Sequence, residues 1–351
     1  MRSTNHLVRL RSILSAGLVA ASLARCSDDP APAVAPRPPA VVAPTCASPD
    51  EAPLRAADGS HPCARLGAVD AAGDDAWPTG DDDPTPVVYV RDGASGDGTR
   101  DAPYGDLATA LAAAPGTVRL ARGVITVSSP VVIRRAVRVR GVGRATSLTA
   151  PGGAFTVEGA GASLTLIGVS IHGGAAGSSA IAATGDVTVR ARDVSIDQPG
   201  RGIALDAATL CAERVTVSRA QGVGVLLSGG ARGYLRGSVV RGGASAGVLV
   251  ARSSVWMRDM LVAENLRDGV AVVGAAAGDA CATDADCATT SACEGFLDGV
   301  TRARACAAEL RAGGTARRCV DVSVIDRTAL TANTGVGLRA HRDVARRGDR
   351  R

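Results

Sequence analysis

Short apolar triplets recur from residue 118 onward at nearly constant spacing. They are VSI at 169–171, VSI at 194–196, VTV at 215–217, SVV at 238–240 and MLV at 260–262, and their last residues are separated by 25, 21, 23 and 22 positions. A second series runs in step, with GIAL at 202–205, GVLL at 224–227, GVLV at 247–250 and GVAV at 269–272. A third apolar patch lies between them, as in LTL at 164–166. The pattern predicts a repeat of about 22 residues with three brief strands.

Three strands and no room for a helix in each repeat predict a parallel β-helix, in which successive coils stack and pair in parallel. Alternate residues of a strand point inward, so the coils would form ladders of like aliphatic side chains. The composition agrees, because 43 glycines accompany only two tryptophans, three tyrosines and two phenylalanines. A core without many rings suits thin stacked layers better than a two-layer globule.

The segment that precedes the repeats, residues 87–123, reads VVYVRDGASGDGTRDAPYGDLATALAAAPGTVRLARG. It resembles the first strand, glycine-rich turn and short capping helix of right-handed parallel β-helix proteins of the pectin-lyase-like superfamily. The matching residues are Tyr89, Gly98, Thr99, Ala102, Pro103 and Tyr104, followed by the apolar helix positions Leu107, Ala110, Leu111 and Ala114. The resemblance covers residues 87–275 and resumes near 320–338. The chain has no lysine, which excludes a phosphate loop of the GxxxxGK[ST] kind.

The N-terminus predicts export. Arg2, Arg9 and Arg11 precede the apolar run at 13–24, which is too short to span a bilayer as a mature helix. The run ends in LARC, which resembles a bacterial lipoprotein cleavage box with Cys26 as the lipidated residue. Arg25 departs from that pattern, and ordinary cleavage after Ala24 is the alternative. We therefore expect residues 1–25 to be a signal peptide and the protein to be secreted or held at the outer membrane or cell surface.

Composition separates the rest of the chain into a linker, a β-helix with an insertion, and a polar tail. Residues 26–86 are rich in Pro, Ala and Asp and predict an extended linker. Its acidic run at 81–83 can attract calcium, although we favour a solvated linker. The β-helix is expected over 87–338, with a cysteine-rich insertion at 276–319. Residues 339–351 form a polar tail without a capping element, which suggests that a partner covers the last coil or that the natural chain is longer.

Nine cysteines in an exported chain predict disulfides. If Cys26 carries lipid, eight remain, and Cys46 and Cys63 can pair with each other. The insertion contributes an odd number, namely Cys281, Cys287, Cys293, Cys306 and Cys319, and Cys211 on an outward position of the coils can supply the sixth. No histidine accompanies them and the paired CxxC spacing of zinc sites is missing, so we expect no metal site. Calcium at the acids of residues 284–286 is a weak alternative.

The resemblance implies enzymes that act on polysaccharides, but their carboxylate clusters are missing from the coils. Superposed coils place Arg192, Glu213, Arg236 and Arg258 in one column and Asp193, Arg214 and Asp259 in the next. The least implausible catalytic residues are Asp193, Arg214, Arg258 and Asp259. We favour the alternative that both columns form a mixed-charge ladder on a solvated face. His172 stands alone in a turn and is expected to be structural.

Another column, containing Thr165, Arg190, Cys211, Tyr234 and Trp256, alternates with the inward Leu164 and Leu166 and should face outward. Tyr234 and Trp256 would then lie on adjacent coils beside Arg236 and Arg258. Such an arrangement suits stacking on sugar rings and pairing with uronates. The alternative, which we favour, is that the inserted segment folds over both rings and buries them.

The sequence therefore predicts an exported, surface-anchored β-helix protein that binds carbohydrate or another cell-surface partner and has no recognisable catalytic site. A diverged polysaccharide lyase or glycoside hydrolase is one alternative, and a purely structural envelope protein or truncated relic is another. A polysaccharide or cell-surface glycan and the membrane, through the lipid anchor, are the expected partners. No cofactor is expected, apart from the weak calcium alternative. The net charge of +5 is modest and spread along the chain, which argues against nucleic-acid binding.

Overall fold

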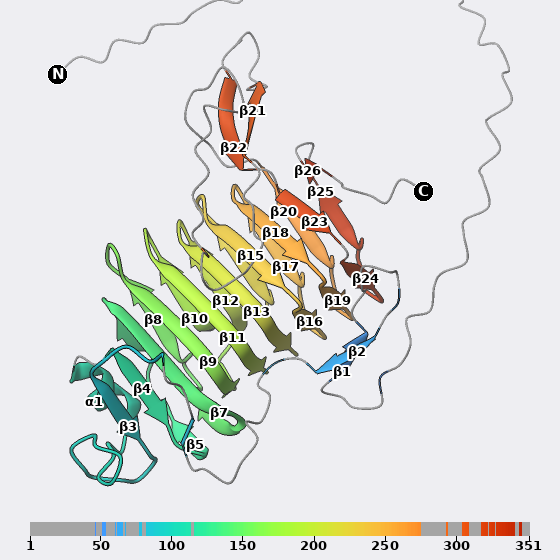
Figure 1. Cartoon of the computed structure of the whole chain (residues 1–351). Helices are drawn as coiled ribbons and strands as arrows, with labels where there is room; N and C mark the ends of the chain where they lie inside the picture. Colours follow the sequence, from blue (N-terminus) through green and yellow to red (C-terminus); the bar gives the residue numbers. More distant parts are fainter. Residues whose placement is uncertain are drawn as a thin grey trace, which may run out of the picture. The chain divides into compact units, whose positions relative to one another are not determined.

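The computed structural model of the chain describes residues 46, 51–53, 60, 62–65, 67, 77–78, 82–113, 116–274, 293, 304–308, 317–321, 323–326, 328–340 and 344–345. The predicted signal peptide, Cys26, Asp81, Ala114, Cys281, Cys287, residues 284–286 and most of the predicted tail lie outside these residues. The described residues form a parallel β-helix built from two large sheets (Figure 1). None of their helices is long and apolar enough to cross a membrane.

The first sheet has eight strands and collects one strand from each coil. Neighbouring strands pair in parallel in the order β6 (Val131–Ile133), β8 (Phe155–Glu158), β10 (Ser179–Thr184), β12 (Arg201–Asp206), β14 (Val225–Ser228), β17 (Val248–Ala251), β20 (Val270–Val273) and β25 (Leu338–Ala340). The GIAL, GVLL, GVLV and GVAV segments supply four of them, so the repeat marks the stacking register.

The second sheet has 14 strands. Its main path is β3 (Val87–Val90), β4 (Thr117–Leu120), β7 (Ala136–Thr149), β9 (Ser163–His172), β11 (Thr188–Asp197), β13 (Thr209–Ser218), β15 (Arg232–Arg236), β18 (Ser254–Arg258), β23 (Ser323–Asp326) and β26 (Val344–Ala345). Beside this path lie β5 (Gly123–Thr126), β16 (Val239–Arg241), β19 (Leu261–Ala263) and β24 (Ala329–Thr331). The two predicted strands of a coil are therefore either one long bent strand, as in β11, or two short ones, as in β15 and β16.

The bend in each coil is made by one residue in the left-handed conformation. These residues are Gly168, Asp193, Arg214, Gly237 and Asp259, with φ between 50° and 61°. The column that contains Asp193, Arg214 and Asp259 is thus a column of corners. A left-handed residue turns the strand without breaking the pairing between coils, and it separates two outward faces of the same sheet.

Ladders of aliphatic residues fill the interior as predicted. Ile171, Ile196 and Val217 are register partners on successive coils, and each is at most 1% exposed. Burial of one such side chain contributes about 1.5–3 kcal/mol. The short helix α1 (Leu107–Ala112) lies at the N-terminal end of the stack, with the side chain of Asp106 accepting a hydrogen bond from the Thr109 amide at 2.7 Å. Its buried residues Leu107, Ala110 and Leu111 confirm the predicted apolar helix positions within the described chain.

The coil that was predicted to resume after the insertion is present. Leu330 of β24 pairs in register with Val262, and the side-chain amide of Asn265 donates to Oδ1 of Asn333 at 3.0 Å. Within the insertion, β21 (Arg304–Ala308) and β22 (Arg317–Asp321) form an antiparallel pair in which Cys306 lies opposite Cys319.

The predicted linker is not simply extended. Its β1 (Glu51–Pro53) and β2 (Cys63–Arg65) form a hairpin, and Cys46 and Cys63 are joined by a disulfide as expected. The expectation of a solvated acidic run is wrong for Asp83. Its side chain is only 2% exposed, because Arg119 at 2.9 Å and Arg138 at 3.1 Å hold it against the first coils.

Candidate functional site

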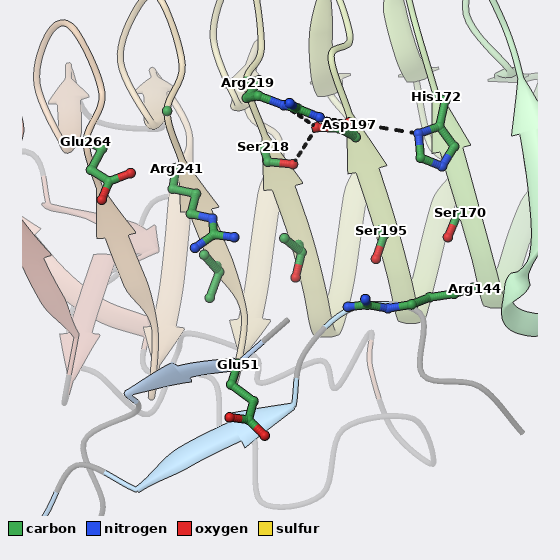
Figure 2. Close-up of a pocket in the computed structure, with 13 residues that line it drawn as sticks. Glu51, Arg144, Ser170, His172, Ser195, Asp197, Ser218, Arg219, Arg241 and Glu264 are labelled. Carbon is green, nitrogen blue, oxygen red and sulfur yellow. Dashed lines mark hydrogen bonds and ion pairs between the residues drawn. The ribbon is translucent and has the colours of Figure 1, made fainter. Parts of the chain in front are cut away.

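An elongated groove of about 660 Å³ follows the second outward face of the sheet, beyond the corner column (Figure 2). Six successive coils contribute one to three residues each to it, and the hairpin contributes one. The lining residues are Glu51, Arg144, Ser170, His172, Ser195, Asp197, Thr216, Ser218, Arg219, Val239, Arg241, Gly242 and Glu264. We call this surface the groove face.

The groove runs along the stacking direction of the coils. Its lining begins with Arg144 of β7 and continues through β9, β11, β13 and β16 to Glu264, which directly follows β19. Neighbouring strands lie about 4.8 Å apart, so five strand spacings give the groove a length of roughly 24 Å. A space this long and narrow fits an extended oligomer better than a single small molecule.

Hydroxyl groups form the floor of the groove. Ser170, Ser195 and Thr216 occupy the same register position on β9, β11 and β13, where strand alternation turns them outward. Farther along the same position, Val239 and Leu261 replace the hydroxyls with apolar side chains. The groove floor thus carries a hydroxyl side chain on three successive coils, of which Ser170 is only 3% exposed, and then becomes apolar.

A second row of polar residues lies two positions farther along each strand, with His172, Asp197, Ser218 and Arg241 in register. Asp197 is the centre of this row (Figure 2). Its carboxylate accepts from Ser218 Oγ at 2.8 Å, from Arg219 Nε at 2.9 Å and from a second Arg219 nitrogen. His172 Nδ1 lies 3.9 Å from the same carboxylate.

These contacts fix the charge of Asp197. Burial raises its pKa, but hydrogen bonds from Arg219 and Ser218, together with the charges of Arg219 and His172, outweigh burial and hold the pKa below that of an ordinary aspartate. The carboxylate is therefore ionised near neutral pH and is suited to accepting hydrogen bonds, not to donating a proton. His172 places a half-exposed imidazole in the groove, and its expected structural role stays a prediction.

The first outward face, on the other side of the corner column, holds the arginine column of the sequence analysis. We call it the arginine face and define it by Arg192, Glu213, Arg236 and Arg258, which share one register position. Arg192 donates to Glu213 at 2.7 Å, and Arg236 pairs with the same carboxylate. The ladder of mixed charge is present, but it is not fully solvated, since the Glu213 side chain is only 7% exposed.

The four weak catalytic candidates lie in ion pairs. Arg214 contacts Asp193 through two hydrogen bonds of 2.6 and 2.8 Å, and both are corner residues. Arg258 Nε lies 3.5 Å from Asp326 and 3.9 Å from Asp259. None of the four lines the groove face. Their catalytic role stays a prediction, and the geometry supplies a structural use for each of them.

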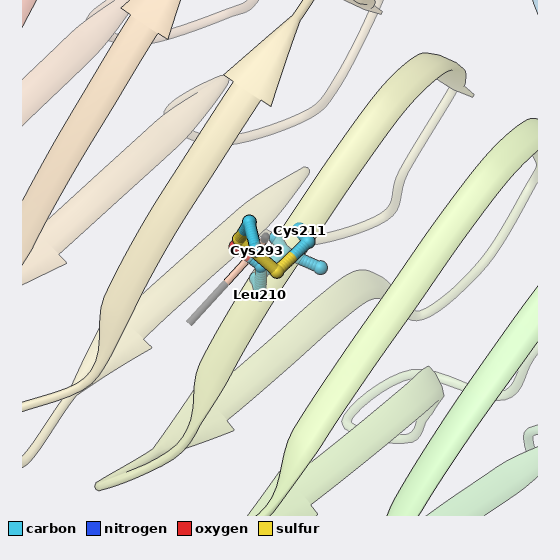
Figure 3. The surroundings of a disulfide bond; sticks show 3 residues. All are labelled: Leu210, Cys211 and Cys293. Carbon is cyan, nitrogen blue, oxygen red and sulfur yellow. Dashed lines mark hydrogen bonds between the residues drawn. A yellow bond between two sulfur atoms is a disulfide. The ribbon is translucent and has the colours of Figure 1, made fainter. Parts of the chain in front are cut away.

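The insertion covers part of the arginine face. Tyr234 and Trp256 are register neighbours as expected. A disulfide joins Cys211 of β13 to Cys293 of the insertion (Figure 3). Tyr234 is only 6% exposed, because it packs with this disulfide, while the half-buried Trp256 packs against the same cluster. The prediction that Cys211 pairs with an insertion cysteine is confirmed, and the exposed, sugar-stacking arrangement is wrong for Tyr234. The insertion removes it from solvent.

Sequence reasoning missed the groove face, although its signal was present. Ser170, Ser195 and Thr216 are the middle letters of the VSI, VSI and VTV triplets, and only the apolar outer letters were used to find the period. In the part of the chain that the structure describes, no group of three or more His, Cys, Asp or Glu side chains is arranged to hold a metal ion.

No protein-family profile matches the chain, and no curated protein matches it in sequence. Among solved structures, the chain is similar to the A-module of the Azotobacter vinelandii mannuronan C-5 epimerase AlgE4, at 15% sequence identity and a TM-score of 0.20. The match covers 74% of this chain and 100% of that module. Similarity at this level carries no conclusion about activity, and the β-helix assignment rests on the strand pairing of the chain itself.

Proposed function

We propose that the groove face binds an extended glycan. The observation that carries this proposal is the polar row of His172, Asp197, Ser218 and Arg241, which lie in register along a groove that spans several coils. A linear glycan presents hydroxyl groups at regular intervals along its length. A surface that offers hydroxyl, carboxylate and guanidinium groups at the regular strand spacing can hydrogen-bond to successive sugar units.

Other extended ligands fit the groove less well. A peptide that adds a strand needs the open edge of a sheet, whereas the groove lies on a sheet face whose backbone groups pair between coils. A nucleic acid needs an excess of positive charge for its phosphates. Here the cationic Arg144, Arg219 and Arg241 are balanced by Glu51, Asp197 and Glu264. A glycan, neutral or lightly charged, suits this balance.

The two disulfides agree with a protein that works in an oxidising, extracellular environment. We propose further that the chain is exported and anchored at the cell surface through Cys26, where the groove would meet glycans of the envelope or the surroundings. Incorporation of labelled fatty acid into the protein, and its loss in Cys26→Ser, would support the anchor. Labelling that survives this substitution would refute it.

Affinity gel electrophoresis on a panel of plant and bacterial polysaccharides tests the binding proposal. The refolded protein should be retarded by at least one glycan, and a His172→Ala, Arg241→Ala double variant should bind at least tenfold more weakly, since each lost hydrogen bond to a charged group costs about 1.5–3 kcal/mol. Arg236→Ala on the arginine face is the matched control and should keep the affinity of the unaltered protein.

The same panel separates the remaining possibilities. Retention that is lost in a Tyr234→Ala, Trp256→Ala double variant but kept in the His172, Arg241 variant would move the site to the arginine face. Release of soluble sugar products would support the alternative of a lyase or hydrolase. Failure of every glycan to retard the protein would refute the proposal and favour a structural role.

A further inference from the structure

The hairpin before the β-helix is seated on the groove face. We define the strap as the described residues between Cys46 and Gly67, which comprise β1, β2 and the Cys46–Cys63 disulfide. Pro53 of β1 pairs with Cys63 of β2, so the disulfide and the hairpin pairing close the strap upon itself. Glu51 of β1 lines the groove together with the coil residues (Figure 2).

Gly67 joins the strap to the hydroxyl floor. Its amide donates to the carbonyl of the corner residue Arg214 at 3.0 Å, and Gly67 is buried. A Cβ atom on this residue would lie 2.3 Å from Ser195 Oγ and 3.0 Å from Thr216 Oγ1. Its φ of +78° also disfavours any residue with a side chain. The backbone at this point therefore touches the floor, and no ligand atom can pass between the two.

Ala64 holds the strap farther along the stack. It packs against the apolar cluster of Val239, Leu261 and Ala263, where the groove floor has changed from hydroxyl to aliphatic side chains. The strap thus follows the coils from β11 and β13 to β19. The strap therefore covers part of the floor, at Ser195, Thr216, Val239 and Leu261, and forms a wall opposite the row of His172, Asp197, Ser218 and Arg241.

We propose that the strap is the specificity-determining wall of the glycan groove and restricts it to linear glycans without substituents on the strap side. This inference rests on the proposed glycan function. A linear chain would lie between the strap and the row of His172, Asp197, Ser218 and Arg241, with the carboxylate of Glu51 accepting hydrogen bonds from its hydroxyls. A branch pointing toward the strap would meet the backbone that Gly67 seats on the floor.

We expect a single substitution at one of its attachment points to displace the strap from the floor. Its disulfide joins two strap residues to each other, and two of its contacts with the coils are the Gly67 hydrogen bond and the packing of Ala64. Gly67→Val adds a branched side chain where a Cβ already has no space, so it should lift the wall. Gly161→Val is the matched control, because Gly161 has the same φ of +78° and a Cβ there meets nothing within 4 Å.

Pairs of glycans with the same backbone test the proposal: mannan and galactomannan, xylan and arabinoxylan, alginate and acetylated alginate. The unaltered protein and Gly161→Val should bind the linear member of a pair at least tenfold more tightly than the substituted member. In Gly67→Val this preference should fall below threefold. Lifting of the strap is measured separately, as faster reduction of the Cys46–Cys63 disulfide by a small thiol in the absence of glycan.

A lifted strap with unchanged preference would overturn the inference and leave the glycan groove standing. Equal binding of both members by the unaltered protein would do the same. If no glycan is retained by the unaltered protein, both proposals fail. Should Gly67→Val fold poorly, Ala64→Gln against the cluster at Val239 and Leu261 loosens the same wall from its other attachment, and the same loss of preference is expected.

Discussion

The arginine face and the groove face belong to the same sheet, and each is covered by a segment from outside the coils. On the arginine face the cover is fastened covalently, since Cys211 of β13 is bonded to Cys293 of the insertion. On the groove face the strap carries a disulfide that joins only its own residues, Cys46 and Cys63. The first cover buries Tyr234, and the second leaves a groove beside it.

The difference shows how one scaffold can bury part of one sheet face and leave a groove on another. A covalent link between the insertion and the coil fixes a dry contact, and ion pairs around Glu213 occupy the rest of that face. The strap is closed upon itself by its own disulfide and meets the coils through a hydrogen bond at Gly67 and an apolar contact at Ala64. We therefore predict that the strap opens without unfolding of the coils, whereas the insertion is held to Cys211 by a covalent bond.

The largest effect should come from removing the covalent cover. A Cys211→Ser, Cys293→Ser double variant loses a link across 82 residues, for which loop-closure entropy predicts about 4.5 kcal/mol of global unfolding free energy. Chemical denaturation measures this loss, and Tyr234 fluorescence should report its new exposure. Unchanged stability would mean that the insertion does not fasten the coils, and the contrast between the two covers would fail.

Removal of the strap disulfide should act locally. In a Cys46→Ser, Cys63→Ser variant the lost link spans 17 residues and is worth about 3 kcal/mol by the same relation. Because the strap can open alone, we expect amide exchange in β1 and β2 to accelerate about a hundredfold while the denaturation midpoint of the coils stays nearly constant. A large shift of that midpoint would show instead that strap and coils unfold together.

The ion pairs of the arginine face should respond to acid. Burial raises the pKa of Glu213, but the hydrogen bond from Arg236 and the charges of Arg192, Arg214 and Arg236 outweigh it and lower the pKa below 4.5. A lowered folded-state pKa stabilises the protein above the ordinary value and loses that contribution as pH falls through the folded-state pKa. Glu213→Gln should therefore cost about 2 kcal/mol at pH 7.

This cost should shrink as the pH falls below the ordinary pKa of a glutamate and through the lowered folded-state pKa of Glu213, because the carboxylate of the unaltered protein then becomes protonated. Denaturation curves across this range measure it, with Glu158→Gln, an exposed partner of Arg134, as the control. A difference that does not change with pH would contradict the assigned ion pairs.

The smallest effect is expected on the groove face. Asp197→Asn removes the charge that holds Arg219 and Ser218 but keeps an oxygen acceptor, so it should cost about 1 kcal/mol or less. Glycan retention should weaken more visibly, since Arg219 is then no longer held beside the groove. If stability drops as much as in Glu213→Gln while retention is unchanged, the carboxylate is structural and the two faces do not differ in use.

The repeat and its inward ladders could be predicted from the sequence because the strand period is regular and every coil places aliphatic residues at the same inward positions. The pairing of Cys211 with the insertion followed from an odd cysteine count and an outward position. The corners could not be predicted, since Asp193, Arg214 and Asp259 are ordinary polar residues in a conformation for which glycine is the usual signal.

The strap was missed for a related reason. A Pro-, Ala- and Asp-rich composition describes a linker when its contacts are unknown, and Gly67 and Ala64 carry no periodicity that points to the coils. The buried Asp83 was hidden in the same way, because its partners Arg119 and Arg138 lie more than 30 positions away in sequence. Contacts made once, outside a repeat, leave no pattern to detect.

The hydroxyl row also relates the length of the groove to the number of coils. Ser170, Ser195 and Thr216 recur once per coil, and the coil is also the unit in which the sequence repeats. Gain or loss of one unit of about 22 residues would lengthen or shorten the groove by one strand spacing of about 4.8 Å. Under the proposed function, the number of coils would set the length of glycan that the groove holds, and duplication of one coil would accommodate a longer chain.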